Sequence, residues 1–280
     1  SIQSGGSYNV VVGDEAGTAI TTGDNNIAVG FAALDAEDTG SNNVAIGASA
    51  LSTLNYNGSG YNTAVGSNAG AAVTTGIKNT ILGGLAGDAI TTGNSNVALG
   101  YSALGANTTA SNNTAVGVSA LAVNTTGTQN VAVGSFSLDA VTTASNNTAI
   151  GYLSGSSITT GASNTLLGST AGDSITTAAN NTAVGQASLG LATTGANNTA
   201  VGYLSGASLT TGNSNVAMGY NALGSDTLGD RAVAIGLSAL ASQNFTSSTD
   251  NYNIGIGYGA GLSNTTGSQN TFIGGLSGTA

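Results

Sequence analysis

The sequence predicts an all-β fold: a parallel β-solenoid, or β-roll, of sixteen coils of about 17 residues with two short strands in each coil. A five-residue segment of the form Asn-Thr-Ala-Val-Gly recurs along the chain, and successive copies lie 17 residues apart, as from Asn9 to Asn26. Glycine, threonine and asparagine are abundant, and all three are poor helix formers. A fixed period in such a chain indicates stacked repeats, in which each coil contacts its neighbours.

The repeat runs through the whole chain, so residues 1–280 are expected to form a single repeat array. The residue that opens each five-residue segment is taken as position one of its coil. Two coils are longer than the rest, 43–61 and 232–252, and insertions into solenoids map to surface loops. The coils start at Asn9, Asn26, Asn43, Asn62, Asn79, Asn96, Asn113, Asn130, Asn147, Asn164, Asn181, Asn198, Asn215, Ala232, Asn253 and Asn270.

The first strand and the corner after it occupy positions two to five. Position four is always aliphatic or Met, as in Val12 and Met218, and position eight is always Ala or Ser, so both are expected to point inward. Position five is glycine in every coil, which indicates a corner that needs a positive φ or a close backbone approach. A second extended segment and a Thr-Thr-Gly turn complete the coil, which leaves no room for a helix.

Positions three, nine and twelve predict two interchangeable kinds of coil. Position nine is either Leu or Gly, and every coil with Leu there has Ala at position three. Position twelve is apolar in most Gly coils and polar or small in most Leu coils, with Leu54, Val141 and Asn264 as exceptions. Because a packed interior penalises added volume, positions three and nine are expected to share one space. The large position-three residues of Gly coils are Val11, Ile81, Leu166 and Phe272.

Asparagine and threonine predict two further ranks along the solenoid. Asn fills position one in fifteen of the sixteen coils, which indicates an internal ladder of amide side chains hydrogen-bonded between coils. The Thr pairs of the final turn, such as Thr74-Thr75 and Thr210-Thr211, are expected to turn one hydroxyl outward in each coil. Ala at position three in eleven coils forms a strip of small residues that favours close approach of other chains.

Composition excludes several classes of function. The chain has no His or Cys, and Lys78 carries its only side-chain amine, so we expect no enzymatic activity and no cofactor. Acidic pairs such as Asp14-Glu15 fit a solvated surface better than a metal site, so no metal is expected. A net charge of −10, with Lys78 and Arg231 as the only basic side chains, disfavours nucleic acid. No apolar run is long enough to insert into a membrane.

Exposed aromatic side chains are the candidate contact residues. Five tyrosines share position six, directly after the corner glycine, where they suit contact with a host-surface glycan or protein, or packing between subunits. The enlarged coils add Tyr56, within the insertion Asn-Tyr-Asn-Gly-Ser-Gly, and Phe245, within the segment 242–250, as variable contacts. The position-six tyrosines are Tyr101, Tyr152, Tyr203, Tyr220 and Tyr258.

The segments Asn-Thr-Ala-Val-Gly, Asn-Val-Ala-Ile-Gly and Asn-Thr-Ala-Ile-Gly resemble the head repeats of YadA-type trimeric autotransporter adhesins. They are also similar to repeat arrays in bacteriophage tail fibres that carry endosialidase-type chaperone domains. The resemblance covers essentially the whole chain, although the coil is longer than the adhesin coil and Thr or Val stands where Ser-Val begins that repeat. It implies a left-handed β-roll, a homotrimer, and a location outside the cell, on the cell surface or on a virion.

These observations favour a structural fibre segment, a shaft or head used for attachment. Two alternatives stay open: a self-polymerising extracellular filament, and an ice-binding solenoid that presents the Thr rank as a flat array. Both ends of the chain are repeat-like, as in Asn9-Val-Val-Val-Gly and Asn270-Thr-Phe-Ile-Gly. Open solenoid ends are edge strands, so flanking domains or end-to-end assembly are expected.

Overall fold

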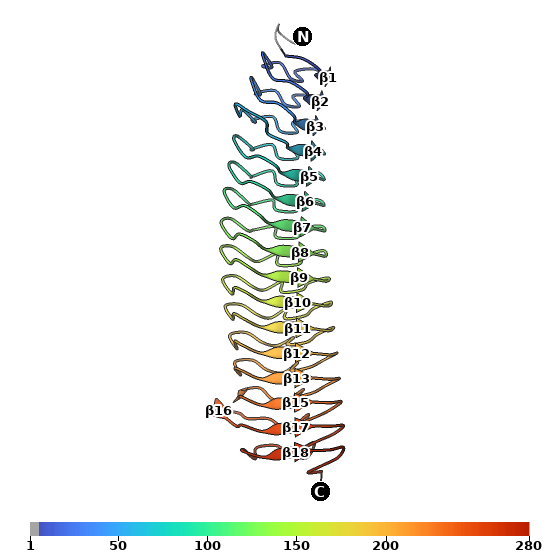
Figure 1. Cartoon of the computed structure of the whole chain (residues 1–280), viewed down its shortest axis with the longest axis vertical. Helices are drawn as coiled ribbons and strands as arrows, with labels where there is room; N and C mark the ends of the chain where they lie inside the picture. The colour runs from blue at the N-terminus through green and yellow to red at the C-terminus, as the bar shows by residue number, and fades with distance from the viewer. Residues whose placement is uncertain (1–5, 280) are drawn as a thin grey trace. The chain divides into compact units, whose positions relative to one another are not determined.

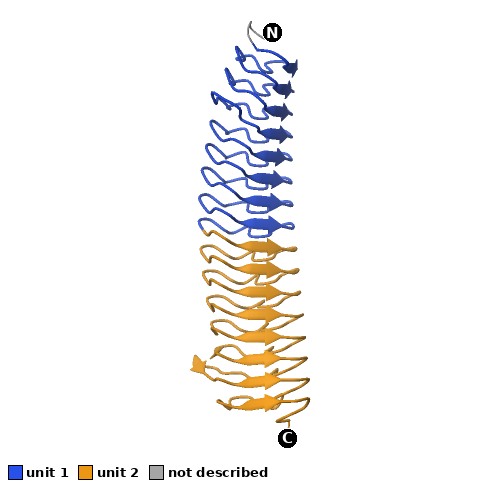
Figure 2. Cartoon of the chain, viewed as in Figure 1, with its two compact units in different colours: residues 1–143 blue, residues 144–280 orange. Residues whose placement is uncertain are grey.

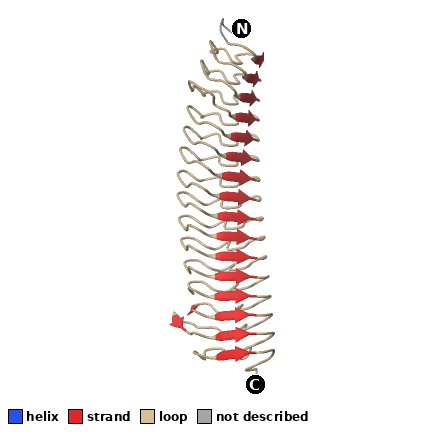
Figure 3. Ribbon diagram, viewed as in Figure 1, coloured by secondary structure: helices blue, strands red, loops and turns tan. Residues whose placement is uncertain are grey.

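The computed structural model describes residues 6–279, which form two compact units, unit 1 up to residue 143 and unit 2 from residue 144 (Figure 2). Both units are built from the same coil, so each is a short parallel β-solenoid (Figure 1). Within residues 6–279 no helix forms, and hence none that is long and apolar enough to cross a membrane (Figure 3).

Each coil contributes one strand of three residues to a parallel sheet, and in each unit partners lie one coil apart, as in Thr182↔Thr199. Two strands of two residues form a separate small sheet in unit 2. The strands are β1 (Val10–Val12), β2 (Ile27–Val29), β3 (Val44–Ile46), β4 (Thr63–Val65), β5 (Thr80–Leu82), β6 (Val97–Leu99), β7 (Thr114–Val116) and β8 (Val131–Val133) in unit 1, and β9 (Thr148–Ile150), β10 (Thr165–Leu167), β11 (Thr182–Val184), β12 (Thr199–Val201), β13 (Val216–Met218), β14 (Gly229–Asp230), β15 (Val233–Ile235), β16 (Thr249–Asp250), β17 (Ile254–Ile256) and β18 (Thr271–Ile273) in unit 2.

The parallel solenoid of 17-residue coils is confirmed, but the expected second strand in each coil is wrong. The segment after the corner does hydrogen-bond to the next coil, as from Gly87 N to Ala103 O at 2.8 Å. Its residues at positions seven and nine, such as Ser102 and Leu104, have φ values of 52° and 53°, in the left-handed region. A strand needs extended residues throughout, so this segment is a chain of turns stacked from coil to coil.

The inward direction expected for position four is also wrong. Along each strand only position three points into the coil, as Ala98 and Ala115 do, and both are fully buried. Positions two and four lie on the other face of the sheet, where Leu82 and Ile150 are exposed. The buried position-three alanines therefore cannot form the strip by which chains were expected to approach one another. Successive side chains of a strand point to opposite faces, so with position three inside the coil, positions two and four must point outward.

The corner glycine is required by the neighbouring coil. Gly100 has a φ of 133°, and a Cβ on it would lie 2.5 Å from the carbonyl oxygen of Gly117. Side chains rarely adopt this φ, and the corners of successive coils leave no room for one. The expectation of a corner with positive φ and close backbone approach is confirmed.

The interior confirms that positions three and nine share one volume. A Cβ on Gly172 would lie 2.8 Å from Ile175 Cδ1 and 2.9 Å from Leu166 Cδ2, so the residues at positions three and twelve occupy the space that Leu fills elsewhere. In a Leu coil, Leu104 is fully buried beside Ala98, and position twelve is Asn107. Asn107 donates its Nδ2 hydrogen to Ala110 O at 3.1 Å, which satisfies a polar group inside the coil.

The asparagine ladder is confirmed, and its main links run from side chain to backbone. The Oδ1 atom of Asn96 accepts the backbone N–H of Asn113 at 3.0 Å, and its Nδ2 donates to Ala110 O of the same coil at 2.9 Å. Side-chain links such as Asn96 Nδ2 to Asn79 Oδ1, 3.2 Å, add to these in several coils. In the regular coils the ladder asparagine therefore closes its own coil and fixes the next one.

Converting one kind of coil into the other should show that three positions act together. Gly87→Leu alone is expected to destabilise the chain by about 1–3 kcal/mol, because Leu overlaps Ile81 and Ile90. The triple variant Ile81→Ala, Gly87→Leu, Ile90→Asn gives this coil the residues that coil 96–112 has at positions three, nine and twelve. It should recover most of that loss. Urea unfolding measures both, and a triple variant no more stable than the single one contradicts a shared volume.

Removing one ladder asparagine should cost far more than removing a neighbouring polar side chain. Asn96→Ala leaves the buried Asn113 N–H without its acceptor and removes one of the two amide donors to the Ala110 carbonyl, for an expected loss of about 1–3 kcal/mol in the free energy of unfolding. Ser95→Ala is the control, because Ser95 precedes Asn96 and its side chain is exposed. Equal urea midpoints for the two variants would show that the ladder is not a stabilising element.

Candidate interaction surfaces

The outer face of each sheet is an uncharged, largely aliphatic surface. Position four is Val, Ile, Leu or Met in every coil, and position two is Val, Ile or Thr. These side chains are half-buried or exposed throughout β1–β8 in unit 1 and throughout the β9–β18 sheet in unit 2. Large contiguous apolar surfaces on soluble proteins mark contact sites, so this sheet face is the first candidate surface. Sequence reasoning missed it because it placed position four inside the coil.

The five position-six tyrosines all lie at the surface, as expected, with exposed fractions from 46% for Tyr203 to 60% for Tyr258. The structure brings only Tyr203 and Tyr220 together, with ring centroids 5.7 Å apart. Tyr101 and Tyr152 each stand without a tyrosine in the adjacent coil. Position six also exposes Phe31, which belongs to the same rank. This tyrosine rank follows the corner glycine at the end of each strand.

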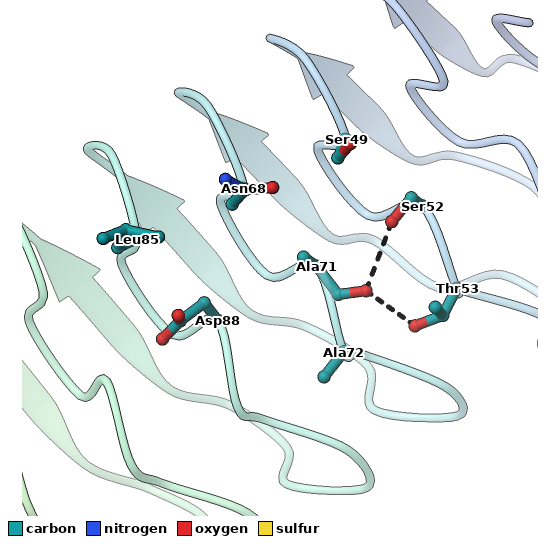
Figure 4. A pocket seen from close by; sticks show the side chains of 8 residues that line it. All are labelled: Ser49, Ser52, Thr53, Asn68, Ala71, Ala72, Leu85 and Asp88. Atoms are coloured by element: carbon teal, nitrogen blue, oxygen red, sulfur yellow. Dashed lines mark hydrogen bonds between the residues drawn. The ribbon is translucent and has the colours of Figure 1, made fainter.

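A shallow groove follows the turn segment in both units. In unit 1 it has a volume of about 430 Å³ and is lined at positions seven, ten and eleven of three successive coils (Figure 4). Thr53 and Ser52 direct their hydroxyl groups to Ala71 O, at 2.7 and 3.4 Å, while Asp88 lies at the other end. The same positions in unit 2 line a groove of about 310 Å³ with Asp173 and Leu191. Both grooves thus combine hydroxyl groups, a carboxylate and apolar surface.

Burial raises the pKa of three carboxyl groups at position ten. The pKa values of Asp88, Asp139 and Asp173 all lie above the ordinary value, and desolvation is the main cause in each. Backbone hydrogen bonds oppose this shift without cancelling it. Within the described residues the buried Oδ1 atom of Asp139 has no hydrogen-bond partner. These carboxyl groups therefore favour protonation more strongly than they would in the unfolded chain.

The two enlarged coils form surface loops, but their aromatic residues are less accessible than expected. Tyr56 is half-buried, and Phe245 is only 6% exposed, so its assignment as a surface contact is wrong. Phe245 packs inward because its backbone bonds to the preceding coil, with Leu228 N donating to Phe245 O at 3.2 Å. The second loop instead exposes Tyr252, which lies 5.7 Å from the guanidinium carbon of Arg231, and Asp250, which pairs with Arg231.

The Thr pairs present one exposed rank, as expected. The first Thr of each pair directs its hydroxyl group to the next coil, as in Thr91 Oγ1 to Thr108 O at 3.1 Å. The second Thr is exposed; in unit 1 this rank includes Thr75, Thr92, Thr109 and Thr126. A single row of hydroxyl groups is narrower than the flat array that ice binding was expected to need.

Among residues 6–279 no group of three or more acidic side chains lies close enough to hold a metal ion. The sheet face, the tyrosine rank and the grooves present apolar side chains, aromatic rings and hydroxyl groups, which suit non-covalent contact with a partner. Comparison with protein-family models, curated proteins and solved structures finds no match to this chain.

The raised pKa values predict that mild acid stabilises the chain. A carboxyl group whose pKa is higher in the folded state binds more protons there, so its contribution to stability grows as the pH falls towards the ordinary value of 3.8 and is lost as the pH rises through the folded pKa. The thermal midpoint should therefore be higher at about pH 5 than at about pH 7.

The triple variant Asp88→Asn, Asp139→Asn, Asp173→Asn is the control for this pH effect. It should show a smaller rise in thermal midpoint on acidification, because the three replaced side chains no longer titrate. A variant that keeps the full rise would assign the effect to other groups.

Proposed function

We propose that this chain is a structural fibre segment, the shaft or head of an extracellular attachment fibre, and that copies of it associate through the uncharged sheet face. The observation that carries the proposal is the run of aliphatic position-four residues, exposed or half-buried on the three-residue strands of each unit, with no charge at positions two or four. Charged residues are depleted at the cores of protein interfaces, and this face shares that composition.

Association of this kind requires a partner whose own surface is complementary to a repeating sheet face. A second or third copy of the chain is such a partner, because its own sheet repeats with the same spacing between strands. A homotrimer agrees with the resemblance to YadA-type adhesin heads and tail-fibre arrays, and the same resemblance supports a location on a cell surface or virion. The tyrosine rank and the grooves then stay available for a glycan or protein on the host surface.

The two alternatives make different use of the molecule. A self-polymerising filament joins copies end to end, through the strands at the first and last coils, and leaves the sheet face free. An ice-binding solenoid acts as a monomer and uses the exposed Thr rank, whose single row is the feature that favours it least. Both alternatives therefore predict a sheet face without a protein partner.

Absolute mass by light scattering, with negative-stain images of the same sample, separates these functions. The proposed trimer predicts a mass of three chains. Leu82→Glu with Leu99→Glu, which places two charges on the sheet face of β5 and β6, should release single chains, because burying unpaired carboxylates opposes association.

Thr92→Glu with Thr109→Glu is the matched control, since it adds the same charge to the same two coils at exposed positions outside the sheet face. The control should keep the parent mass. Single chains in the unmodified protein overturn the proposal, and so does a sheet-face variant that keeps the parent mass. Open-ended polymers of undefined mass favour the filament.

A further inference from the structure

Two buried carboxylates occupy a position that is apolar, small or amide-bearing in the other coils. Glu37 and Asp226 both stand at position twelve, and both side chains are fully buried. Each lies in the coil directly before one of the enlarged coils, 43–61 and 232–252. Position twelve is acidic in no other coil. Since burying a carboxylate is costly, its occurrence at these two places needs a structural reason.

Regular coils show which backbone group is involved. In three of them the N–H at position fifteen donates to the position-thirteen carbonyl of the next coil. The bonds are Gly76 N to Thr91 O at 3.2 Å, Gly161 N to Thr176 O at 3.4 Å and Gly195 N to Thr210 O at 3.4 Å. An insertion in the next coil changes the path of the chain from this carbonyl onward. The position-fifteen N–H of the coil before it then needs another acceptor.

The carboxylates supply that acceptor and also hold the inserted loop. Glu37 accepts the N–H of Gly40, at position fifteen of its own coil, at 2.7 Å, and its other oxygen accepts the N–H of Tyr56 in the loop at 3.4 Å. Asp226 accepts the N–H of Gly229, again at position fifteen, at 3.1 Å and that of Phe245 at 3.0 Å. Two loops of different length and sequence are thus held by the same pair of contacts.

The pocket that holds each carboxylate also constrains position fifteen. A Cβ on Gly40 would lie 2.5 Å from Glu37 Cδ and 2.5 Å from Tyr56 O, and one on Gly229 would overlap Asp226 Oδ2. Three coils that precede regular coils carry alanine at position fifteen, Ala110, Ala144 and Ala178. Both junctions combine an acid at position twelve with glycine at position fifteen, in Glu37-Asp-Thr-Gly40 and Asp226-Thr-Leu-Gly229, and glycine at position fifteen is also common in the regular coils.

We propose that Glu37 and Asp226 are loop-anchoring residues, and that an acid at position twelve with glycine at position fifteen fixes an enlarged loop in the following coil. The carboxylate replaces the inter-coil acceptor that the insertion displaces and ties down the first part of the loop. This inference concerns how surface loops are held on the solenoid, and it stands whether or not the chain forms the proposed fibre.

A double-mutant cycle in the full chain tests the anchor. One change is Glu37→Leu, for which coil 43–61 gives a precedent, because Leu54 occupies position twelve there beside Leu51. The other change replaces residues 55–61 with Thr-Thr-Gly-Asn-Ser, the residues at positions thirteen to seventeen of coil 79–95, and so restores a regular coil. Glu37→Leu should lower the urea midpoint when the loop is present and leave it unchanged or raise it when the loop is absent.

Hydrogen exchange of the isosteric Glu37→Gln variant gives a second readout. At least one of the Gly40 and Tyr56 amides should exchange at least about tenfold faster than in the parent, because glutamine keeps one acceptor oxygen where Glu37 uses two, and its NH₂ group cannot accept. The Gly76 amide, at position fifteen of a regular coil, is the internal control and should keep its rate. Asp226→Ala, which removes the Oδ1 atom that accepts both amides, should likewise accelerate exchange at Gly229 and Phe245. An equal effect of Glu37→Leu with and without the loop, or unchanged exchange at these amides in both Glu37→Gln and Asp226→Ala, would overturn the proposal.

Discussion

The side chain of the first asparagine in each coil sets the geometry on which the other features depend. Its amide hydrogen atoms close the coil onto the position-fifteen carbonyl, and its oxygen receives the backbone of the next coil. A coil with so few large side chains gains little from hydrophobic burial alone, so buried hydrogen bonds must fix its path. Where the ladder asparagine is replaced by Ala232, Asn251 supplies the acceptor for Asn253 from within the enlarged coil.

The interior adapts to sequence change because each coil needs only one bulky anchor. Leu at position nine or a larger residue at positions three and twelve fills the same space, and the backbone at position nine has the same left-handed conformation in both kinds of coil, as at Leu104 and Gly87. Holding Leu in this conformation costs energy that glycine avoids. The gain from filling the interior offsets that cost in the Leu coils.

Function on such a scaffold lies on its surfaces. The sheet face repeats from strand to strand without charge, the grooves repeat at fixed coil positions in both units, and only the enlarged coils break the regularity. A repeating face suits other copies of the chain, whereas irregular loops suit discrimination among partners. Anchoring loops by a carboxylate from the preceding coil allows the two kinds of surface to coexist on one molecule.

The amino-acid sequence by itself determined the repeat, the parallel register, the glycine corner, the shared interior volume and the asparagine ladder. Each follows from residues that recur at one coil position. The sequence did not show the direction of position four, because an aliphatic residue satisfies either face of a strand. The turn conformation of the second segment, the burial of Phe245 and the roles of Glu37 and Asp226 were decided by the tertiary structure. All three depend on the coil stacked alongside, whose backbone supplies or removes hydrogen-bond partners that no single repeat contains.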